Sequence, residues 1–432
     1  MDAAYCSCVI EDKTVLDSKE TKKTMLNEFT DKTIKYMNEV DIDYRKARGQ
    51  YFTPKSIREH LLSQLPNTLS KPKVLDPGCG TGEFLISARE YFNSPELYGW
   101  DIDAKLIGLA RKLVPDAKLR VTDALREEIA ECYDFVIGNP PYYEFYPDRL
   151  IRKKFSNIVG GRTNIFGLFI ELGLRLLKDG GYLAYVVPPS MNNGAYFRRL
   201  RKSIVDNSNI EYLKILDNAN LFHMANQMIM LIVLKKGENR GNYVFTHNGI
   251  SIFSEKPEYL ESAFEGKTTL YELGYTVRTG RLVWNEHKEL LVHNPEEGIP
   301  LIWSHNITES GLELTKGHKK PQYVRIEDFD VGPAIVVNRI TGAAKSARLR
   351  AAIIPEKLKF IAENHCNVIF PPRKETQLRM EFGTNEYKDS LSLESIVNQL
   401  RSPEKLKVIQ NVTGNTQVSK NELERLFPLD IP

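Results

Sequence analysis

The stretch VLDPGCGTGEFL, residues 74–85, decides the fold of this chain. An apolar run ends in Asp76, and Gly78, Gly80 and Gly82 follow at alternate positions before a helix start. Glycine adopts backbone angles that are barred to other residues and lets a ligand approach the main chain closely. The pattern predicts a strand, a tight turn and a helix, as in doubly wound α/β folds. By itself such a turn serves a dinucleotide, a phosphate or merely a tight connection.

Apolar runs recur along the next 160 residues and are separated by stretches of helical pattern. We interpret residues 97–100, 133–137, 182–187 and 228–234 as further buried strands. Strands that alternate with helices predict a parallel sheet covered on both faces. The polar stretch 235–242 then predicts a linker. We therefore expect a helical lead-in at 1–44, an α/β domain at 45–237 and a separate mixed α+β domain at 243–432.

Composition sets the broad class of the protein. A chain of 432 residues with 42% hydrophobic and 27% charged residues is typical of a globular protein with two domains. No apolar run approaches the roughly 20 residues that span a bilayer, and the start lacks the pattern of a secretory signal, so we expect a cytoplasmic protein. The five cysteines are scattered, which argues against a disulfide framework, and we expect no metal site. Two basic clusters, residues 316–320 and 345–350, are candidate nucleic-acid contacts or simply solvated faces.

Acidic residues follow three successive predicted strands. Asp76 suits a methionine ammonium group and would repel a pyrophosphate, while Asp101 stands where ribose hydroxyls bind in doubly wound folds. Asp123 supplies an acceptor for an adenine amino group. Each aspartate alone could instead cap a helix. Together they predict S-adenosylmethionine as the cofactor, and Ile102 and Ala124 are included among its expected contacts.

The fourth strand ends in Asn139-Pro140-Pro141-Tyr142, which we predict to be the catalytic loop. The prolines fix the backbone. The Asn139 side-chain oxygen and the Pro140 main-chain oxygen could each accept a hydrogen bond from an exocyclic amine, whose lone pair then points at a methyl donor. Tyr142 offers an aromatic face to an extruded base. The alternative is an ordinary strand-end turn. Methylation of cytosine C5 needs a thiolate nucleophile, which is usually presented by Pro-Cys, and none of the five cysteines follows a proline.

With these motifs in this order, residues 45–237 resemble the gamma-class (TaqI-like) DNA adenine-N6 methyltransferases. The resemblance implies a Rossmann-like class I S-adenosylmethionine-dependent methyltransferase domain followed by a target-recognition domain. Residues 48–54, RGQYFTP, match the family's first motif, which implies that Thr53 and Pro54 line the methionine end of the cofactor together with Asn139 and Pro141.

Two later segments are also similar to motifs of this family. Residues 164–169 resemble the helix that closes over the cofactor adenine, with Phe169 in the contact position. Residues 221–223 resemble the motif whose aromatic residue packs on the flipped base, which nominates Phe222 beside Tyr142. The alternative for Phe222 is a core phenylalanine. Glu83 follows the glycine turn at a position where many members of the family carry a hydrophobic or another residue, and we assign it no function.

In the second domain, residues 279–285, 337–341 and 412–417 are similar to segments of target-recognition regions. The resemblance implies methylation of adenine N6 in duplex DNA by base flipping and direct in-line transfer. It further implies a monomer that acts with or without a separately encoded restriction endonuclease.

Four alternatives stay open. The same loop serves methylation of a glutamine amide in protein or of guanine N2 in RNA, and cytosine N4 differs little in chemistry. A DNA-binding subunit that is inactive without partners is the alternative that is not an enzyme.

Overall fold

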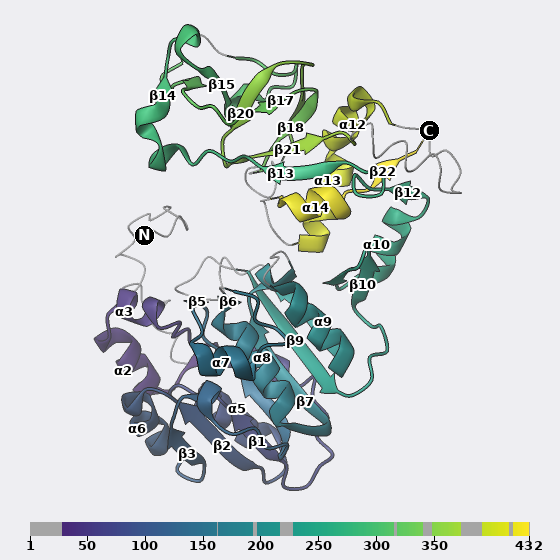
Figure 1. Ribbon diagram of the computed structural model, residues 1–432. Helices are drawn as coiled ribbons and strands as arrows, with labels where there is room; N and C mark the ends of the chain where they lie inside the picture. Colours follow the sequence, from purple (N-terminus) through teal and green to yellow (C-terminus); the bar gives the residue numbers. More distant parts are fainter. Residues whose placement is uncertain are drawn as a thin grey trace. The chain divides into compact units, whose positions relative to one another are not determined.

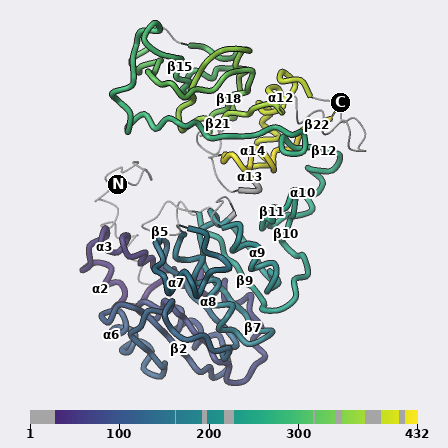
Figure 2. The backbone as a smooth tube through the Cα atoms, in the orientation of Figure 1, coloured from purple at the N-terminus to yellow at the C-terminus, as the bar shows by residue number. Residues whose placement is uncertain are grey.

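A computed structural model describes residues 28–161, 163–192, 197–216, 228–314, 318–339, 348–372, 391–413 and 418–431. The chain divides into two compact units, which are traced from purple to yellow in Figures 1 and 2. The first comprises Met1–Pro188 and Arg199–Asn242, and the second comprises Pro189–Arg198 and Tyr243–Pro432. The helical segment before residue 45 is therefore part of the first unit, and the boundary after Asn242 lies at the end of the stretch that we expected to be a linker.

A seven-stranded sheet with the order β3-β2-β1-β4-β7-β9-β8 forms the centre of the first unit. Its strands are β1 (Lys73–Asp76), β2 (Glu96–Asp101), β3 (Lys118–Val121), β4 (Tyr133–Gly138), β7 (Leu177–Val187), β8 (Ser208–Leu216) and β9 (Ile229–Lys236). The strands β3, β2, β1, β4 and β7 are parallel. Because their carboxyl ends meet at one edge, the loops after β1, β2, β3 and β4 lie together.

The expectation of an all-parallel sheet is wrong for one strand. β9, which contains the predicted run 228–234, pairs antiparallel with both β7 and β8. It pairs directly with the strand that precedes it in the chain, an arrangement typical of antiparallel neighbours. β9 is buried on both faces over its first six residues. Its continuous apolar run therefore looks like that of a parallel strand, although its direction is opposite.

Helices cover both faces of the sheet, as predicted. They are α4 (Lys55–Leu62), α5 (Glu83–Tyr91), α6 (Ala104–Leu113), α8 (Ile165–Leu176) and α9 (Arg198–Asn207). One apolar cluster joins α4, α5 and α6 to one face of β1, β4, β7 and β9. On the other face, Gly173 of α8 packs so closely that a Cβ there would lie 2.5 Å from Leu183 Cδ1. Ser203 of α9 donates a hydrogen bond of 2.7 Å to Glu171 of α8, so these two helices share that face.

Shorter elements surround the carboxyl edge of the sheet. They are α2 (Asp31–Glu39), α3 (Ile42–Ala47), α7 (Arg149–Lys154), β5 (Glu144–Phe145) and β6 (Thr163–Asn164). Within the helical lead-in expected at 1–44, α2 begins at the Thr30 cap, and residues 1–27 lie outside the described residues.

The second unit is a mixture of strands and short helices, as expected. One sheet holds β13 (Thr276–Thr279), β21 (Cys366–Phe370), β18 (Ala334–Asn338) and β19 (Ala351–Ile354). A second sheet holds β14 (Leu291–Val292), β16 (Tyr323–Val324), β15 (Ile299–Ile302), β20 (Lys359–Ala362) and β17 (Asp330–Val331). Two further strand pairs are β10 (Val244–His247) with β11 (Ile250–Phe253), and β12 (Lys267–Thr268) with β22 (Leu429–Asp430).

Four helices of this unit contribute to one apolar core with the first of its sheets. They are α10 (Pro257–Phe264), α12 (Leu393–Leu400), α13 (Pro403–Thr413) and α14 (Lys420–Arg425). Across both units, none of the described helices combines the length and the apolar character that a membrane span requires.

Candidate active site

Two of the three predicted aspartates, Asp76 and Asp101, hold the glycine turn. The Gly78 amide donates to Asp76 Oδ1 at 3.0 Å, and the Gly80 amide donates to Asp101 Oδ2 at 2.9 Å. Gly80 and Gly82 have φ values of 54° and 90°, and Gly82 directly precedes α5. The turn thus needs glycine at both positions, because a Cβ is disfavoured in this left-handed region.

Asp76 is a buried carboxyl group, with 2% of its surface exposed. Burial, with a smaller contribution from the nearby Asp101, raises the pKa of Asp76 to about 8. Gly138 at the end of β4 lies against it, and a Cβ on Gly138 would be 2.7 Å from Asp76 Oδ1. No cationic side chain in the described part of the chain forms an ion pair with Asp76. A buried acid of this kind is stabilised in its ionised form by a cationic ligand.

The other two aspartates differ in role. Asp101 accepts the Gly80 and Asp103 amides, and burial raises the pKa of its carboxyl group. The next residue, Ile102, is 70% exposed, an unusual position for a large apolar side chain at the rim of a site. Asp123 accepts the Leu125 amide at 3.1 Å and caps the short helix that begins at Ala124, so it does have the capping role that was the alternative.

The predicted catalytic loop follows β4 directly. The Asn139 side-chain amide donates to the Tyr51 main-chain oxygen at 2.9 Å. The Tyr142 hydroxyl, which carries one hydrogen, faces both Asn139 Oδ1 and the main-chain oxygen of Val186, the latter at 2.7 Å. In this structure, therefore, Tyr142 occupies the acceptor that we assigned to the amine. Pro140, the second residue of the loop, is buried.

Tyr51 belongs to the first motif, RGQYFTP, but we assigned it no role from the sequence. Its ring stacks on that of Tyr142, with the centres 5.8 Å apart and the planes at 22°. Phe166 meets Tyr142 edge-on, with the ring centres 6.2 Å apart. Gly49 holds this segment against the loop, since a Cβ there would lie 2.7 Å from the Tyr142 amide nitrogen. The position of Tyr51 in the first motif, two residues before Thr53, was the one signal in the sequence that could have indicated a role for it.

Residues from distant motifs meet beside the glycine turn. A Cβ on Gly78 would lie 3.5 Å from Phe169 Cε1 and 4.0 Å from Pro141 Cδ. Thr53 is 4% exposed, and its hydroxyl oxygen is buried without a hydrogen-bond partner among the described residues. An unpaired buried hydroxyl is costly, so it marks a position where a ligand group fits. Pro54, the next residue, is the N-cap of α4.

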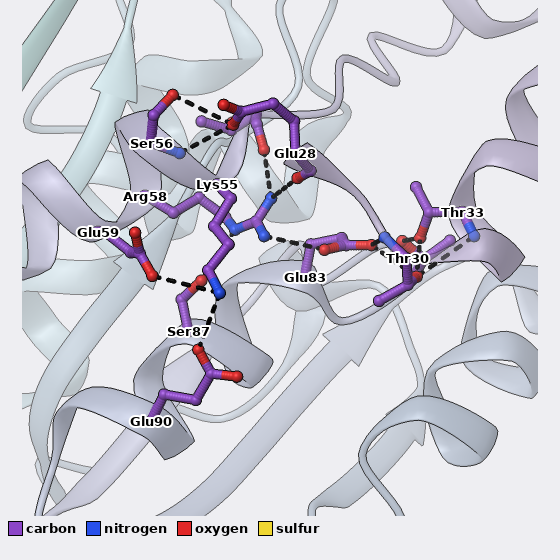
Figure 3. Close-up of polar contacts among 12 residues, drawn as sticks. Glu28, Thr30, Thr33, Lys55, Ser56, Arg58, Glu59, Glu83, Ser87 and Glu90 are labelled. Atoms are coloured by element: carbon purple, nitrogen blue, oxygen red, sulfur yellow. Dashed lines mark hydrogen bonds and ion pairs between the residues drawn. The ribbon is translucent and has the colours of Figure 1, made fainter. Parts of the chain in front are cut away.

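Arg58 and Glu83 form a buried ion pair (Figure 3). They are 2% and 6% exposed, and their side chains are 3.0 Å apart. Arg58 also donates to the Thr53 main-chain oxygen and to Ser87 Oγ. Glu83 accepts from both the amide and the hydroxyl of Thr30. The pair therefore joins three segments: the start of α2, the first motif and the start of α5.

We assigned Glu83 no function from the sequence, and Arg58 belongs to none of the predicted motifs. No spacing pattern relates the two, because Arg58 lies 25 residues before Glu83, and Glu83 lies 53 residues after Thr30. A further buried contact, from the Thr33 hydroxyl to the Thr81 hydroxyl at 2.8 Å, attaches α2 to the glycine turn.

Some of the predicted site residues lie outside the residues that the structure describes. Phe222 lies in 217–227, which the structure does not describe. Residues 315–317 and 340–347, which include parts of both basic clusters and of the segment 337–341, are likewise outside it, as are residues 414–417 of the last segment.

The comparison with known proteins concerns the part of the chain that carries this site. The Type II methyltransferase M.CvrRI of Paramecium bursaria Chlorella virus XZ-6E is 28% identical over 66% of this chain and 74% of its own length. The Type II methyltransferase M.BsuBI of Bacillus subtilis is 23% identical over 94% of this chain and 92% of its own length. Among solved structures, the M protein of the type I restriction enzyme EcoKI is 21% identical with a TM-score of 0.37, over 46% of this chain and 45% of that one. Residues 36–263, more than half of the chain, match the family model described as N-6 DNA Methylase, and the protein therefore belongs to that family.

Proposed function

We propose that this protein methylates N6 of adenine at specific sites in duplex DNA, as the modification enzyme of a restriction-modification pair. The observation that carries the proposal is the place of Asn139-Pro140-Pro141-Tyr142 at the carboxyl end of β4, with the Asn139 amide fixed by the Tyr51 carbonyl. The first unit performs the chemistry as a monomer, and residues 243–432 form the target-recognition domain. Because residues 48–54 precede the glycine turn, we further propose the gamma class.

Family membership implies S-adenosylmethionine as the methyl donor, which supplies an activated methyl group when bound. The residues present fit this cofactor. Asp76 would hold the ammonium group with its buried carboxylate, and the unpaired Thr53 hydroxyl would bind at the same end. Asp101 would accept the ribose hydroxyls and the exposed Ile102 would border the adenine, while Phe169 borders the turn at Gly78.

The chain positions the target amine rather than acting as a strong base. Asn139 donates its amide hydrogen to Tyr51, so its oxygen is left as an acceptor for one N–H of the amine. The Pro140 carbonyl accepts the second N–H. With both hydrogens held, the nitrogen lone pair is directed at the methyl group, and alignment and electrostatics lower the barrier. The target amine must displace the Tyr142 hydroxyl from Asn139 Oδ1.

Tyr142 has two roles in this proposal. Without substrate its hydroxyl donates to the partly buried Asn139 oxygen. With substrate its ring forms one wall for the flipped base, which has been taken out of the stack at a cost of a few kcal/mol.

The test is incubation of the purified chain with unmethylated genomic DNA and S-adenosylmethionine labelled in the methyl group. We expect label in N6-methyladenine after digestion to nucleosides, at a defined set of sites on sequencing. Label in N4-methylcytosine, in RNA or in protein glutamine would replace the proposal with one of the alternatives. Asn139→Ala should abolish transfer but leave binding of S-adenosylhomocysteine intact.

A further inference from the structure

One described residue from each of the two basic stretches noted in the sequence lies near the same histidine in the second unit. Lys320 and Arg350, one from each cluster, both act electrostatically on the imidazole of His305. His305 lies in the short helix Ser304–Asn306, directly after β15. Its ring stacks on that of His318, with the ring centres 4.1 Å apart and the planes at 13°.

Aromatic rings extend this stack. His305 also stacks on Trp303, with the ring centres 6.1 Å apart, and Trp303 in turn lies 6.1 Å from Trp284. The Lys320 ammonium lies 4.6 Å from the Trp303 ring centre and 5.6 Å from that of Trp284. We call Trp284, Trp303, His305, His318, Lys320 and Arg350 the cation–aromatic cluster.

The cluster is held by a rigid polar scaffold. Asn306 is fully buried and accepts the Trp303 amide while donating to Glu313 and Gln322. The Trp303 indole donates to the Pro321 main-chain oxygen at 2.8 Å. These bonds position His305 and Lys320 before any ligand arrives, which reduces the cost of ordering them on binding.

Charge in the cluster is one-sided. Arg281, Arg325 and Arg348 of this unit each pair with a carboxylate. By contrast, Lys320 and Arg350 enter no ion pair within the part of the chain that the structure describes. Burial lowers the pKa of His305, and the nearby His318, Lys320 and Arg350 lower it further. Two like charges without a paired carboxylate indicate a site for an anion.

We propose that the cation–aromatic cluster binds the phosphate backbone of duplex DNA. The inference rests on the proposed function and adds to it the surface that contacts the substrate backbone. Phosphate contact is favoured over base stacking because Lys320 lies over the faces of both indoles, and Trp303 is only 3% exposed. Rings covered in this way hold the ammonium in place by cation–π attraction and are not available to an unpaired base.

The experiment measures binding of the full chain to two mixed-sequence 30-bp duplexes of unrelated sequence over a range of NaCl concentration. Each phosphate contact contributes about 0.9 to the slope of log K against log salt. We therefore expect the double variant Lys320→Ala, Arg350→Ala to lower the slope by about 2, equally for both duplexes. Lys320→Arg keeps the charge and should restore its share of the slope.

Lys407→Ala is the matched control, because Lys407 is an exposed lysine of α13 outside the cluster. Its slope should equal that of the wild type. An unchanged slope in the double variant, a loss confined to one duplex, or a greater loss for single-stranded DNA would overturn the inference.

Failure of the inference and failure of the proposed function give different results. If the wild type methylates DNA and the double variant keeps the wild-type slope, the inference alone is wrong. If the wild type binds S-adenosylhomocysteine but transfers no label to DNA, the proposed function is wrong. An unchanged thermal unfolding profile of the double variant shows that the second unit, which carries both substitutions, has folded.

Discussion

The side-chain amide of Asn139 donates a 2.9 Å hydrogen bond to the main-chain oxygen of Tyr51, which lies 88 residues earlier in the chain. This bond fixes which way the amide faces, because only its nitrogen can donate to a carbonyl. The Asn139 oxygen is thereby presented as an acceptor. The first motif thus orients the predicted catalytic loop in addition to its predicted role at the cofactor.

Asn139→Asp tests this orientation. The carboxylate cannot donate to Tyr51 and instead repels its carbonyl oxygen, so the acceptor geometry is lost. We expect kcat to fall by about 100-fold or more, with the affinity for S-adenosylhomocysteine changed by less than about threefold. Steady-state kinetics and calorimetry measure the two. A variant with wild-type kcat would show that the amide has no part in transfer.

Two variants of Tyr142 separate the contributions of its hydroxyl and of its ring to kcat/KM. Tyr142→Phe removes the hydroxyl that shares Asn139 Oδ1 but keeps the aromatic wall, so we expect kcat/KM within about tenfold of the wild type. Tyr142→Ala removes the wall and should cost about 1–3 kcal/mol of base stacking, equivalent to roughly 5- to 150-fold in kcat/KM. Equal losses in the two variants would assign the effect to the hydroxyl instead.

Cofactor binding should depend on pH through Asp76. Its pKa is about 8 in the folded protein, against 3.8 for an ordinary aspartate, so the ligand-free site is largely protonated at neutral pH. A cationic ligand selects the ionised form, and the affinity for S-adenosylhomocysteine should rise with pH up to about 8, by at most about tenfold per unit. Calorimetry from about pH 6 to about pH 9 measures it, and Asp76→Asn should flatten the profile.

The same shift predicts how the stability of the ligand-free protein responds to pH. Between about pH 4 and about pH 8 the folded state holds a proton that the unfolded chain has lost. The contribution of Asp76 to the free energy of unfolding therefore falls as pH rises through this window and is constant above it. Asp76→Asn should remove this part of the dependence, as measured by denaturant titration. A wild-type profile equal to that of the variant would contradict the shifted pKa.

The ion pair of Arg58 and Glu83 should matter far more than a surface pair. Glu83→Ala leaves the buried Arg58 guanidinium without its charged partner, which typically costs about 3–5 kcal/mol of unfolding free energy. Since Arg58 also holds the Thr53 carbonyl, the KM for S-adenosylmethionine should rise more than kcat falls. Arg89→Ala is the control: its pair with Asp116 is exposed, so its loss should cost about 0–1 kcal/mol.

Gly138 is required by its contact with Asp76. A Cβ there would meet Asp76 Oδ1 at 2.7 Å, and φ is 144°. We expect Gly138→Ala to weaken cofactor binding and to lower the melting temperature. Gly108→Ala, on α6 with nothing within 4 Å of the added Cβ, should instead stabilise the protein by about 0.5–1 kcal/mol. A harmless Gly138→Ala would mean that β4 can shift away from Asp76.

Local pattern in the sequence determined much of the first unit. The apolar runs predicted β1, β2, β4, β7 and β9, and the glycine spacing predicted the turn before α5. Such features are readable because burial on a sheet and a left-handed turn each depend on a few adjacent residues. The placement of Asp76 and Asp101 at the ends of parallel strands followed from the same local reasoning.

Only the tertiary structure decided the rest. The direction of β9, the bond from Asn139 to Tyr51, the pairing of Arg58 with Glu83 and the meeting of Lys320 with Arg350 at His305 all join residues from separate parts of the chain. No spacing rule relates such partners, because their distance is set by how whole strands and helices pack. A single sequence therefore shows which chemical groups are present, while packing determines which of them meet.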